Sequence, residues 1–251
     1  MFYKLNIQHF YLKMNDKQKV LVFTATYNER WNIEELIIGI RKNLPESSIL
    51  IIDDNSPDKT KEIVENLQSK HQNLYLIVRE KKLGLDTAHK LAYEFALKNN
   101  YNYLITMDAD LSHDPRDLRK ILENLEISPF VIGSRYIKGG KCLMTGWRLN
   151  LSKYGNLFIK KVSGINCNEF TTSFRGFDLK KLDGFNLNKV NAKGYSFMMG
   201  TLFEIQKKKF PIKEIPIIFQ DRTKGKSKIP RIEILRTFKN LFILTIKKYF
   251  R

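Results

Sequence analysis

Residues 103–115 read Tyr-Leu-Ile-Thr-Met-Asp-Ala-Asp-Leu-Ser-His-Asp-Pro, and the prediction of the fold starts from them. The apolar start of this stretch is typical of a buried strand, and residues 117–125 have the spacing of a helix. Asp108 and Asp110 therefore lie just beyond the carboxyl end of a strand. In open α/β sheets, ligands bind at this edge.

Asp108 and Asp110 are the first candidates for metal ligands. In an extended chain, side chains two residues apart point the same way, so the two carboxylates would share a face. Two such oxygen ligands suit Mg²⁺ or Mn²⁺, above all where phosphates complete the coordination. The alternative is that Asp110 or Ser112 only caps the next helix, and His113 is interpreted as a residue at the entry to that helix. The rest of the chain must decide.

The first half of the chain alternates between short apolar strands and amphipathic helices. Strands are predicted at residues 19–24, 48–52, 74–78, 103–105 and 130–132. The helix after the first strand is expected to be capped by Asn32. This alternation predicts an α/β fold with a mostly parallel central sheet flanked by helices. Right-handed crossovers then place the polar clusters that end the strands at one edge. That edge would be lined by Tyr27, Glu29, Asp53, Asp54, Arg79, Lys82, Asp108, Asp110 and Arg135.

The second half of the chain has a different pattern. It predicts, in order, a basic amphipathic helix at 147–162, a strand at 169–177, a helix at 195–206, an edge strand at 210–219, a basic loop at 221–228 and an amphipathic helix at 232–249. The expected organisation is therefore a tail at 1–17, an α/β domain at 18–230 and a C-terminal amphipathic, membrane-proximal helix at 231–251.

The charge of the chain indicates an anionic partner. Its 44 Lys and Arg residues against 26 Asp and Glu residues give a net charge of +18. Residues 207–251 alone hold 14 basic and 3 acidic residues. A nucleotide, a lipid phosphate, a membrane surface or nucleic acid would suit this excess. Cys142 and Cys167 have no metal-binding spacing, which indicates free thiols in a reducing compartment.

An acidic pair among basic loops suits chemistry on a diphosphate, because a bound metal can neutralise the leaving group. The chain has no P-loop motif and no dinucleotide-binding glycine motif after a strand. It also has no nucleophile elbow. A P-loop kinase, a dinucleotide oxidoreductase and a serine hydrolase are therefore not expected.

Seven motifs, in order, resemble those of the dolichol-phosphate (polyprenol-phosphate) mannose synthases, inverting glycosyltransferases with the GT-A fold. The similarity runs from about residue 20 to about residue 244. The motifs are Ala-Thr-Tyr-Asn-Glu at 25–29, Ile-Ile-Asp-Asp-Asn-Ser-Pro-Asp at 51–58, Arg-Glu-Lys-Lys-Leu-Gly-Leu at 79–85, Met-Asp-Ala-Asp-Leu-Ser-His at 107–113, Gly-Ser-Arg-Tyr at 133–136, Thr-Thr-Ser-Phe-Arg at 171–175, and Asp221-Arg222 through Ser227-Lys228.

The resemblance implies roles for individual residues. The nucleotide-sugar set is Ala25, Tyr27, Glu29, Ile52, Asp54, Lys82, Asp108, Ala109, Asp110, Arg135, Arg222 and Lys228. Asp108, Asp110 and Arg135 would be catalytic, and Asp108, Asp110 and Ser112 would hold Mg²⁺ or Mn²⁺. Arg148, Ser152 and Arg175 would contact the phosphate of the acceptor.

The resemblance also implies a reaction: metal-dependent transfer of mannose from GDP-mannose to a polyprenyl phosphate, with inversion. The chain departs from the family pattern at residues 198–200, where Met-Met-Gly replaces Gln-x-Glu. Another sugar, such as glucose from UDP-glucose, or a glycan hydroxyl acceptor therefore stays open. A non-catalytic nucleotide or nucleic-acid binder is less favoured, because acidic residues share the basic edge.

The lipid acceptor implies contact with a membrane. No apolar run approaches the ~20 residues that span a bilayer. We therefore expect a cytoplasmic protein that is peripheral on the cytoplasmic face of a membrane, together with a membrane-anchoring partner and no nucleic-acid partner.

Overall fold

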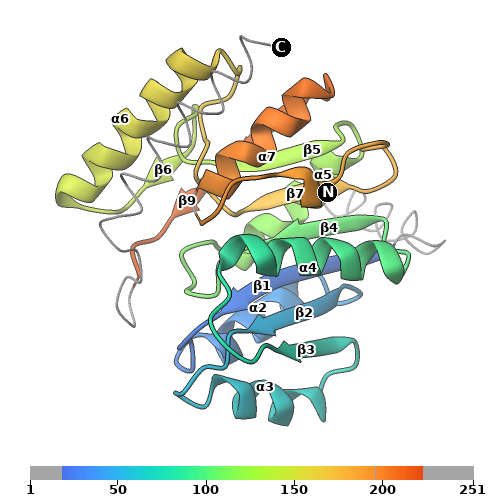
Figure 1. Cartoon of the computed structure of the whole chain (residues 1–251). Helices are drawn as coiled ribbons and strands as arrows, with labels where there is room; N and C mark the ends of the chain where they lie inside the picture. Colours follow the sequence, from blue (N-terminus) through green and yellow to red (C-terminus); the bar gives the residue numbers. More distant parts are fainter. Residues whose placement is uncertain (1–18, 195, 223–251) are drawn as a thin grey trace, which may run out of the picture.

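The computed structural model describes residues 19–194 and 196–222 and contains a seven-stranded sheet covered by helices on both faces (Figure 1). The strand order is β3-β2-β1-β4-β7-β5-β8. These strands are β1 (Val20–Thr26), β2 (Ser48–Asp53), β3 (Leu74–Val78), β4 (Tyr103–Thr106), β5 (Phe130–Ser134), β7 (Arg175–Asp178) and β8 (Ile212–Pro216). A second, two-stranded sheet pairs β6 (Lys141–Cys142) with β9 (Ile218–Phe219). The predicted α/β fold with a mostly parallel sheet is confirmed.

The core lies on the two faces of the sheet, because side chains alternate along each strand. Leu21 and Phe23 point into one cluster, and Val20 and Val22 point into the other. The first face is covered by α4 (Leu85–Lys98) and α7 (Ser196–Lys207). The second is covered by α2 (Ile33–Asn43), α3 (Thr60–Gln68) and α5 (Leu118–Leu125). The predicted helix at 147–162 is α6 (Gly146–Ser163), which lies at the margin of the molecule (Figure 1).

Three local predictions were wrong. Only β7 forms within the strand predicted at 169–177, and it runs antiparallel to both of its neighbours. The strand predicted at 210–219 is divided into β8 and β9, although β8 is an edge strand as expected. Asn32 is the N-cap residue of α2, but its side chain makes no capping hydrogen bond, and its amide nitrogen donates to the Glu29 carboxylate at 2.8 Å. The predicted tail, the helix at 232–249 and Lys228 lie outside the described residues.

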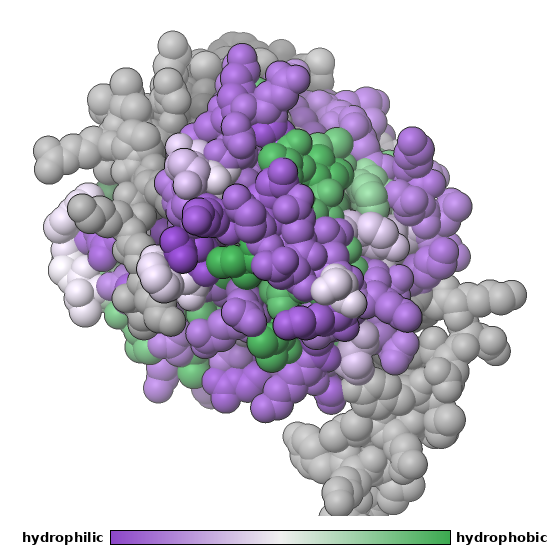
Figure 2. Space-filling model, turned by 90° about the horizontal axis from the view of Figure 1, so that it is seen from below, coloured by the Kyte–Doolittle hydropathy of each residue, from purple (hydrophilic) through white to green (hydrophobic). Residues whose placement is uncertain are grey.

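The parallel strands end together, and this brings the polar loops to one edge. Thr26 pairs with Asp53 in the register of β1 and β2, and Phe23 pairs with Thr106 in that of β1 and β4. The side of the molecule near β3 and α3, which Figure 2 views from below, has a mainly hydrophilic surface. No helix among the described residues has both the length and the apolarity to cross a membrane.

Candidate active site

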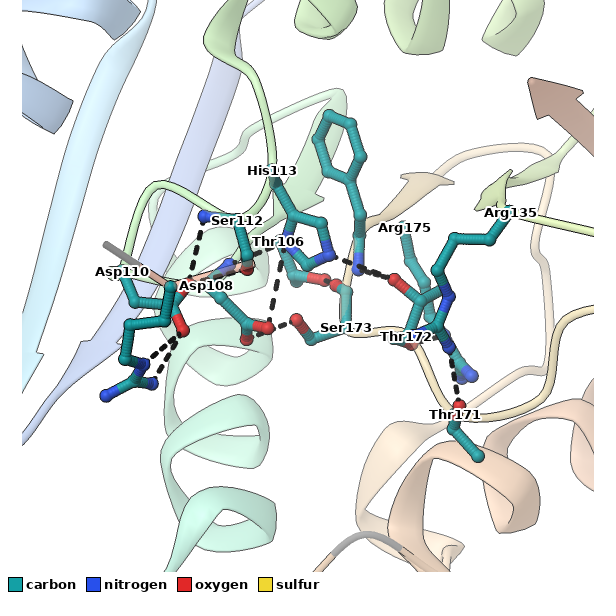
Figure 3. Close-up of polar contacts among 12 residues, drawn as sticks. Thr106, Asp108, Asp110, Ser112, His113, Arg135, Thr171, Thr172, Ser173 and Arg175 are labelled. Carbon is teal, nitrogen blue, oxygen red and sulfur yellow. Dashed lines mark hydrogen bonds and ion pairs between the residues drawn. The ribbon is translucent and has the colours of Figure 1, made fainter. Parts of the chain in front are cut away.

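Asp110 is held from two sides at the carboxyl edge of β4 (Figure 3). One of its oxygens, Oδ1, accepts from the backbone N–H and the hydroxyl of Ser112, at 3.1 and 2.6 Å. The other, Oδ2, accepts from Nε and Nη2 of Arg222, at 2.9 and 2.6 Å. The short helix that follows is capped by Asp114, which accepts from the N–H of Arg116 at 2.9 Å. Neither Asp110 nor Ser112 therefore caps this helix, and the prediction of a helix cap at these residues is wrong.

Arg222 joins Asp110 to the loop after β1. Its Nη1 lies 3.5 Å from Oε1 of Glu29, whose other oxygen accepts from the amide of Asn32. Burial lowers the pKa of Arg222, but the carboxylates of Asp110 and Glu29 outweigh this effect, so its pKa lies above the ordinary value. Burial likewise raises the pKa of Asp110, and Arg222 and Ser112 outweigh it, so this pKa is lowered. Asp110 is therefore an ionised carboxylate near neutral pH.

Asp108 is held by residues that are distant in the sequence. Its Oδ1 accepts from the hydroxyl of Ser173 at 2.5 Å, and its backbone N–H donates to Nδ1 of His113 at 3.1 Å. Since Nδ1 accepts, the proton of the neutral ring is assigned to Nε2, which lies 3.2 Å from the hydroxyl oxygen of Thr172. His113 is buried and stacked on Phe174, and burial lowers its pKa. His113 thus fixes the acidic pair to the loop at 169–174 and is not a simple helix-entry residue.

Arg135 lies beside this loop, in a buried ion pair. Its Nε and Nη2 each lie 2.7 Å from an oxygen of Glu169, and Nη2 also donates to the Thr171 hydroxyl at 2.8 Å. Burial lowers the pKa of Arg135, but the Glu169 carboxylate outweighs it and raises the pKa. The ring of Phe219 lies under the guanidinium, 4.9 Å from its carbon. These contacts anchor the end of β5 to the loop before β7.

The nucleotide-side residues lie on the loops after β1, β2 and β3. Asp54 and Arg79 form a buried ion pair, and Asp54 also accepts from the backbone N–H of Leu83 at 3.3 Å. The ammonium of Lys82 lies 4.5 Å from the centre of the Tyr27 ring. Within the same set, Ile52 is buried at the end of β2, Ala109 is buried between the two aspartates, and Ala25 is partly exposed on β1.

The three residues expected at the acceptor phosphate do not share a surface. Arg148 is exposed on α6 and lies 3.5 Å from Asp221, while Ser152, one turn further along, accepts from the Tyr136 hydroxyl at 2.7 Å. Arg175 is only 1% exposed and donates to the carbonyls of Phe170, Thr172 and Met198. Burial lowers its pKa to about 10. In this structure Arg175 shapes the loop at 170–174 from within and presents no surface to a phosphate.

The donor set suits a cation that completes its coordination with phosphate oxygens. No group of three or more Asp, Glu, His or Cys residues converges as a metal cage among residues 19–194 and 196–222. Asp108 and Asp110 offer two carboxylates, and such a pair with substrate phosphates is the usual arrangement for Mg²⁺. The Ser112 hydroxyl donates to Asp110, so it orients that carboxylate. The residues present therefore fit a divalent ion bound together with a diphosphate.

The profile of Glycosyl transferase family 2 matches residues 21–185, which include all of these acidic loops. The chain belongs to glycosyltransferase family 2. It is 32% identical to the polyprenol monophosphomannose synthase of Mycolicibacterium smegmatis, over 84% of this chain and 81% of that protein. It is also 32% identical to the undecaprenyl-phosphate mannosyltransferase of Micrococcus luteus, over 84% of this chain and 87% of that protein. The predicted family and the assignment as a glycosyltransferase are confirmed.

The comparison with solved structures confirms the GT-A fold. Glucosyl-3-phosphoglycerate synthase from Mycobacterium tuberculosis, with phosphoglyceric acid, aligns with a TM-score of 0.66 over 92% of this chain and 79% of that chain, at 14% identity. The same protein with Mn²⁺, UDP and phosphoglyceric acid aligns with a TM-score of 0.65 over 92% and 78%. Divalent ions with UDP are therefore found on this fold.

Most residues of this edge were predicted from the sequence, but the residues that hold Asp108 in place were not. Glu29, Asp110 and Arg222 were predicted to share one site, and the structure joins them directly. His113 and Ser173 were not assigned to the acidic pair. The run of hydroxyl residues at 171–173 was a usable signal, because hydroxyl groups can donate to carboxylates.

Proposed function

We propose that this glycosyltransferase moves mannose from GDP-mannose to a polyprenyl phosphate, with inversion at the anomeric carbon. The observation that carries the proposal is the bridge that Arg222 forms between the carboxylates of Asp110 and Glu29, beside Asp108, at the carboxyl edge of the sheet. The names of the curated relatives support the sugar and the lipid class.

The two ends of the donor would bind to different loops. Ala25, Tyr27, Glu29, Ile52 and Asp54 would receive the guanosine, with Lys82 over the ring of Tyr27. Asp108, Ala109 and Asp110 would receive the ribose and diphosphate, with a divalent cation on the carboxylates. Arg222 and Lys228 would contact the diphosphate. For Arg222 this requires a partial exchange of carboxylate contacts for phosphate contacts, which a guanidinium fork makes equally well.

The reaction would be a single in-line displacement. An oxygen of the acceptor phosphate forms a bond to the anomeric carbon while the bond from that carbon to the diphosphate breaks on the opposite face. When bound, Mg²⁺ or Mn²⁺ supplies charge neutralisation at the leaving group. A phosphate acceptor is already ionised near neutral pH, so it does not need a strong general base. The chain therefore contributes positioning and electrostatic stabilisation.

Arg148 and Ser152 are the proposed contacts for the acceptor phosphate, since both lie on α6 and Arg148 is exposed. Arg135, oriented by Glu169, would contact the donor diphosphate or the incoming phosphate. The lipid acceptor places the enzyme on the cytoplasmic face of a membrane as a peripheral protein. A membrane-anchoring partner protein remains part of the proposal.

Transfer of another sugar is the second candidate function. The residues at 198–200, which differ from the family pattern, are the observation that favours it. Met198 and Met199 are buried in the core. A Cβ on Gly200 would lie 2.7 Å from Cγ1 of Val190, so no larger side chain fits there without rearrangement. Residues that pack in the core thus stand where the family pattern has an amide and a carboxylate. Transfer of glucose from UDP-glucose must therefore be measured beside transfer of mannose from GDP-mannose.

A panel of radiolabelled donors tests the proposal. The purified chain is incubated with GDP-mannose, UDP-glucose or other sugar nucleotides, a polyprenyl phosphate and Mn²⁺, and label in the organic phase is counted. We expect the greatest transfer from GDP-mannose, and at least about a hundredfold loss in Asp110→Asn. Asp114→Asn, which changes an aspartate that caps a short helix and pairs with the exposed side chain of Arg116, should keep the activity. No organic-phase label with any donor would overturn the lipid-acceptor proposal.

A further inference from the structure

Asp86 is a buried carboxylate in the first turn of α4, and it contacts the second half of the chain. The residue is only 7% exposed. Its Oδ1 accepts from the backbone N–H of Gly194, 108 residues further along the sequence, at 3.0 Å. Gly194 lies just before α7, so this hydrogen bond joins the start of α4 to the entry of α7.

The packing of α4 places Asp86 beside the acidic pair. The helix lies across β1 and β4 (Figure 1), and the ring of His89 lies 5.0 Å from that of Phe23 on β1. Phe23 pairs with Thr106 in the register of β1 and β4, and Asp108 follows Thr106 by two residues. Asp86 precedes His89 by three residues, so it shares that face of the helix. Because α4 begins after β3, Asp86 also lies one turn nearer the carboxyl edge.

The same turn of α4 is tied to the loops on the nucleotide side. Arg79 donates from Nη1 to the hydroxyl of Thr87 at 2.6 Å and from Nη2 to the carbonyl of Gly84 at 3.1 Å. Arg79 is also the partner of Asp54, which belongs to the nucleotide-side residues. The first turn of α4 thus lies between the loops that would receive the nucleotide and the entry of α7.

One oxygen of Asp86 has no partner in the part of the chain that the structure describes. Its Oδ2 accepts no hydrogen bond and lies at ion-pair distance from no cation there. Lys90, one turn further along α4, directs its ammonium toward the ring of Phe197 at 5.9 Å. The positive end of the helix dipole stabilises the carboxylate, but it gives Oδ2 no donor. Since buried polar groups are normally hydrogen-bonded, the open oxygen indicates a place for a donor group of a ligand.

We propose that Asp86 determines which sugar is bound, by accepting a hydrogen bond from a hydroxyl group of the sugar in the donor. The inference rests on the proposed function, whose donor site it makes more specific. The carboxylate would repel a phosphate, whereas neutral hydroxyl groups donate to it in short, charge-assisted hydrogen bonds. Because the contact depends on the position of one hydroxyl group, it discriminates between sugars.

Two further observations favour a sugar as the ligand of Asp86. Among the described residues, Asp86 does not join Asp108 and Asp110 in a metal cage, so a cation does not explain the open oxygen. Residues 196–200 at the entry of α7 read Ser-Phe-Met-Met-Gly and contain no acidic residue. The carboxylate at the junction of the two helices therefore comes from α4.

Binding of a donor and of its nucleotide tests this role without an acceptor. GDP-mannose and GDP, each with Mn²⁺, are titrated into the full chain by isothermal titration calorimetry. Asp86→Asn keeps an oxygen for the N–H of Gly194 but removes the charge from the open atom. We expect this variant to bind GDP-mannose about tenfold more weakly and to bind GDP as the wild type does.

Deoxymannose donors identify the hydroxyl group. Analogues of GDP-mannose that each lack one hydroxyl group are titrated into the wild type and into Asp86→Asn. One analogue should bind the wild type at least about tenfold more weakly than GDP-mannose. The variant should lose most of this discrimination, because its contact with that hydroxyl group is already weakened. The same discrimination in both proteins for every analogue would overturn the contact.

The matched control is Asp117→Asn. Asp117 is 6% exposed and lies at the start of α5, but Lys120 already pairs with it at 2.7 Å. The control should bind both ligands as the wild type does, and both variants should keep the wild-type circular dichroism spectrum. Equal weakening of GDP-mannose and GDP in Asp86→Asn, or no weakening of either, would overturn the sugar contact.

Failure of the sugar-transfer proposal gives a different result. If the wild type binds GDP-mannose but transfers no sugar to a polyprenyl phosphate, that proposal fails, and the affinities of Asp86→Asn still decide the sugar contact. If the wild type binds UDP-glucose and not GDP-mannose, UDP-glucose and UDP take the place of GDP-mannose and GDP in the comparison. A wild type that binds neither donor would overturn both proposals.

Discussion

His113 shows how one side chain connects the two halves of the site. Its ring accepts from the N–H of Asp108 and contacts the hydroxyl of Thr172, 59 residues away in the sequence. The ring is also held between Phe174 and Phe219. His113 is therefore a positioning residue for the acidic pair, because its hydrogen bond holds the backbone of Asp108 in place and so orients the carboxylate of that residue.

Replacing His113 by Phe should impair transfer without unfolding the protein. The aromatic ring keeps its stacking, but the N–H of Asp108 loses its partner at a cost of about 1–3 kcal/mol. The hydroxyl of Thr172 keeps only the N–H of Phe174. We expect about a tenfold lower kcat/KM and a higher Mn²⁺ concentration for half-maximal rate. His71→Phe, at a partly exposed position after α3, is the control. An unchanged metal requirement in His113→Phe would contradict the positioning role.

At the scale of elements, α5 and β7 pack more closely than a side chain would allow. A Cβ on Gly176 of β7 would lie 2.5 Å from Cγ2 of Ile121 and 2.9 Å from Cδ1 of Leu125. β7 pairs antiparallel with both β4 and β5 and comes directly after the loop that carries Ser173, so α5 packs closely on the strand that follows this loop. The position of the loop thus depends on the packing of α5.

Gly176→Ala and Gly155→Ala form a matched pair that tests this packing. Overpacking should lower the free energy of unfolding of Gly176→Ala by about 1–3 kcal/mol. Gly155 lies within α6, and its Cβ would meet nothing within 4 Å. Gly155→Ala should therefore raise this free energy by about 0.5–1 kcal/mol through helix propensity. Urea denaturation of both variants measures the difference, and equal effects would refute the packing account.

At the scale of the whole molecule, His89 joins the two halves of the fold. It lies on α4, 5.0 Å from the ring of Phe23 on β1 and 5.8 Å from that of Phe197 on α7. Burial, with a smaller effect of the Arg175 charge, lowers the pKa of His89 to about 3. The ring is neutral in the folded protein throughout the physiological range.

This buried histidine should make stability depend on pH. Its pKa is about 3 when folded and about 6.5 when unfolded, so unfolding takes up a proton between these values. The free energy of unfolding is then highest above pH 6.5 and falls as the pH decreases, by up to about 1.4 kcal/mol per pH unit. His89→Phe should flatten this dependence between pH 6.5 and 4.5 in urea denaturation. A wild-type slope in the variant would show that other groups cause it.

The sequence by itself determined the elements and the edge where chemistry occurs. Apolar runs and helical periods located β1 to β5 and the helices between them, because both patterns are local and follow from burial on sheet faces. Right-handed crossovers then required that Glu29, Asp54 and Asp110 meet. Asp108 and Asp110 could be predicted as metal ligands for the same reason, since their place at this edge depends only on where β4 ends.

Only the tertiary structure decided what holds these residues. Arg175 appears as a surface cation in an alternating pattern, yet it is buried because the loop at 170–174 folds around its guanidinium. Besides their local contacts, Asp108, Asp110 and Arg135 have partners from segments 34 to 112 residues away. Such pairings depend on the packing of β7 and the path of the chain after β9. Local periodicity carries no information about contacts of that range, so the folded chain alone specifies them.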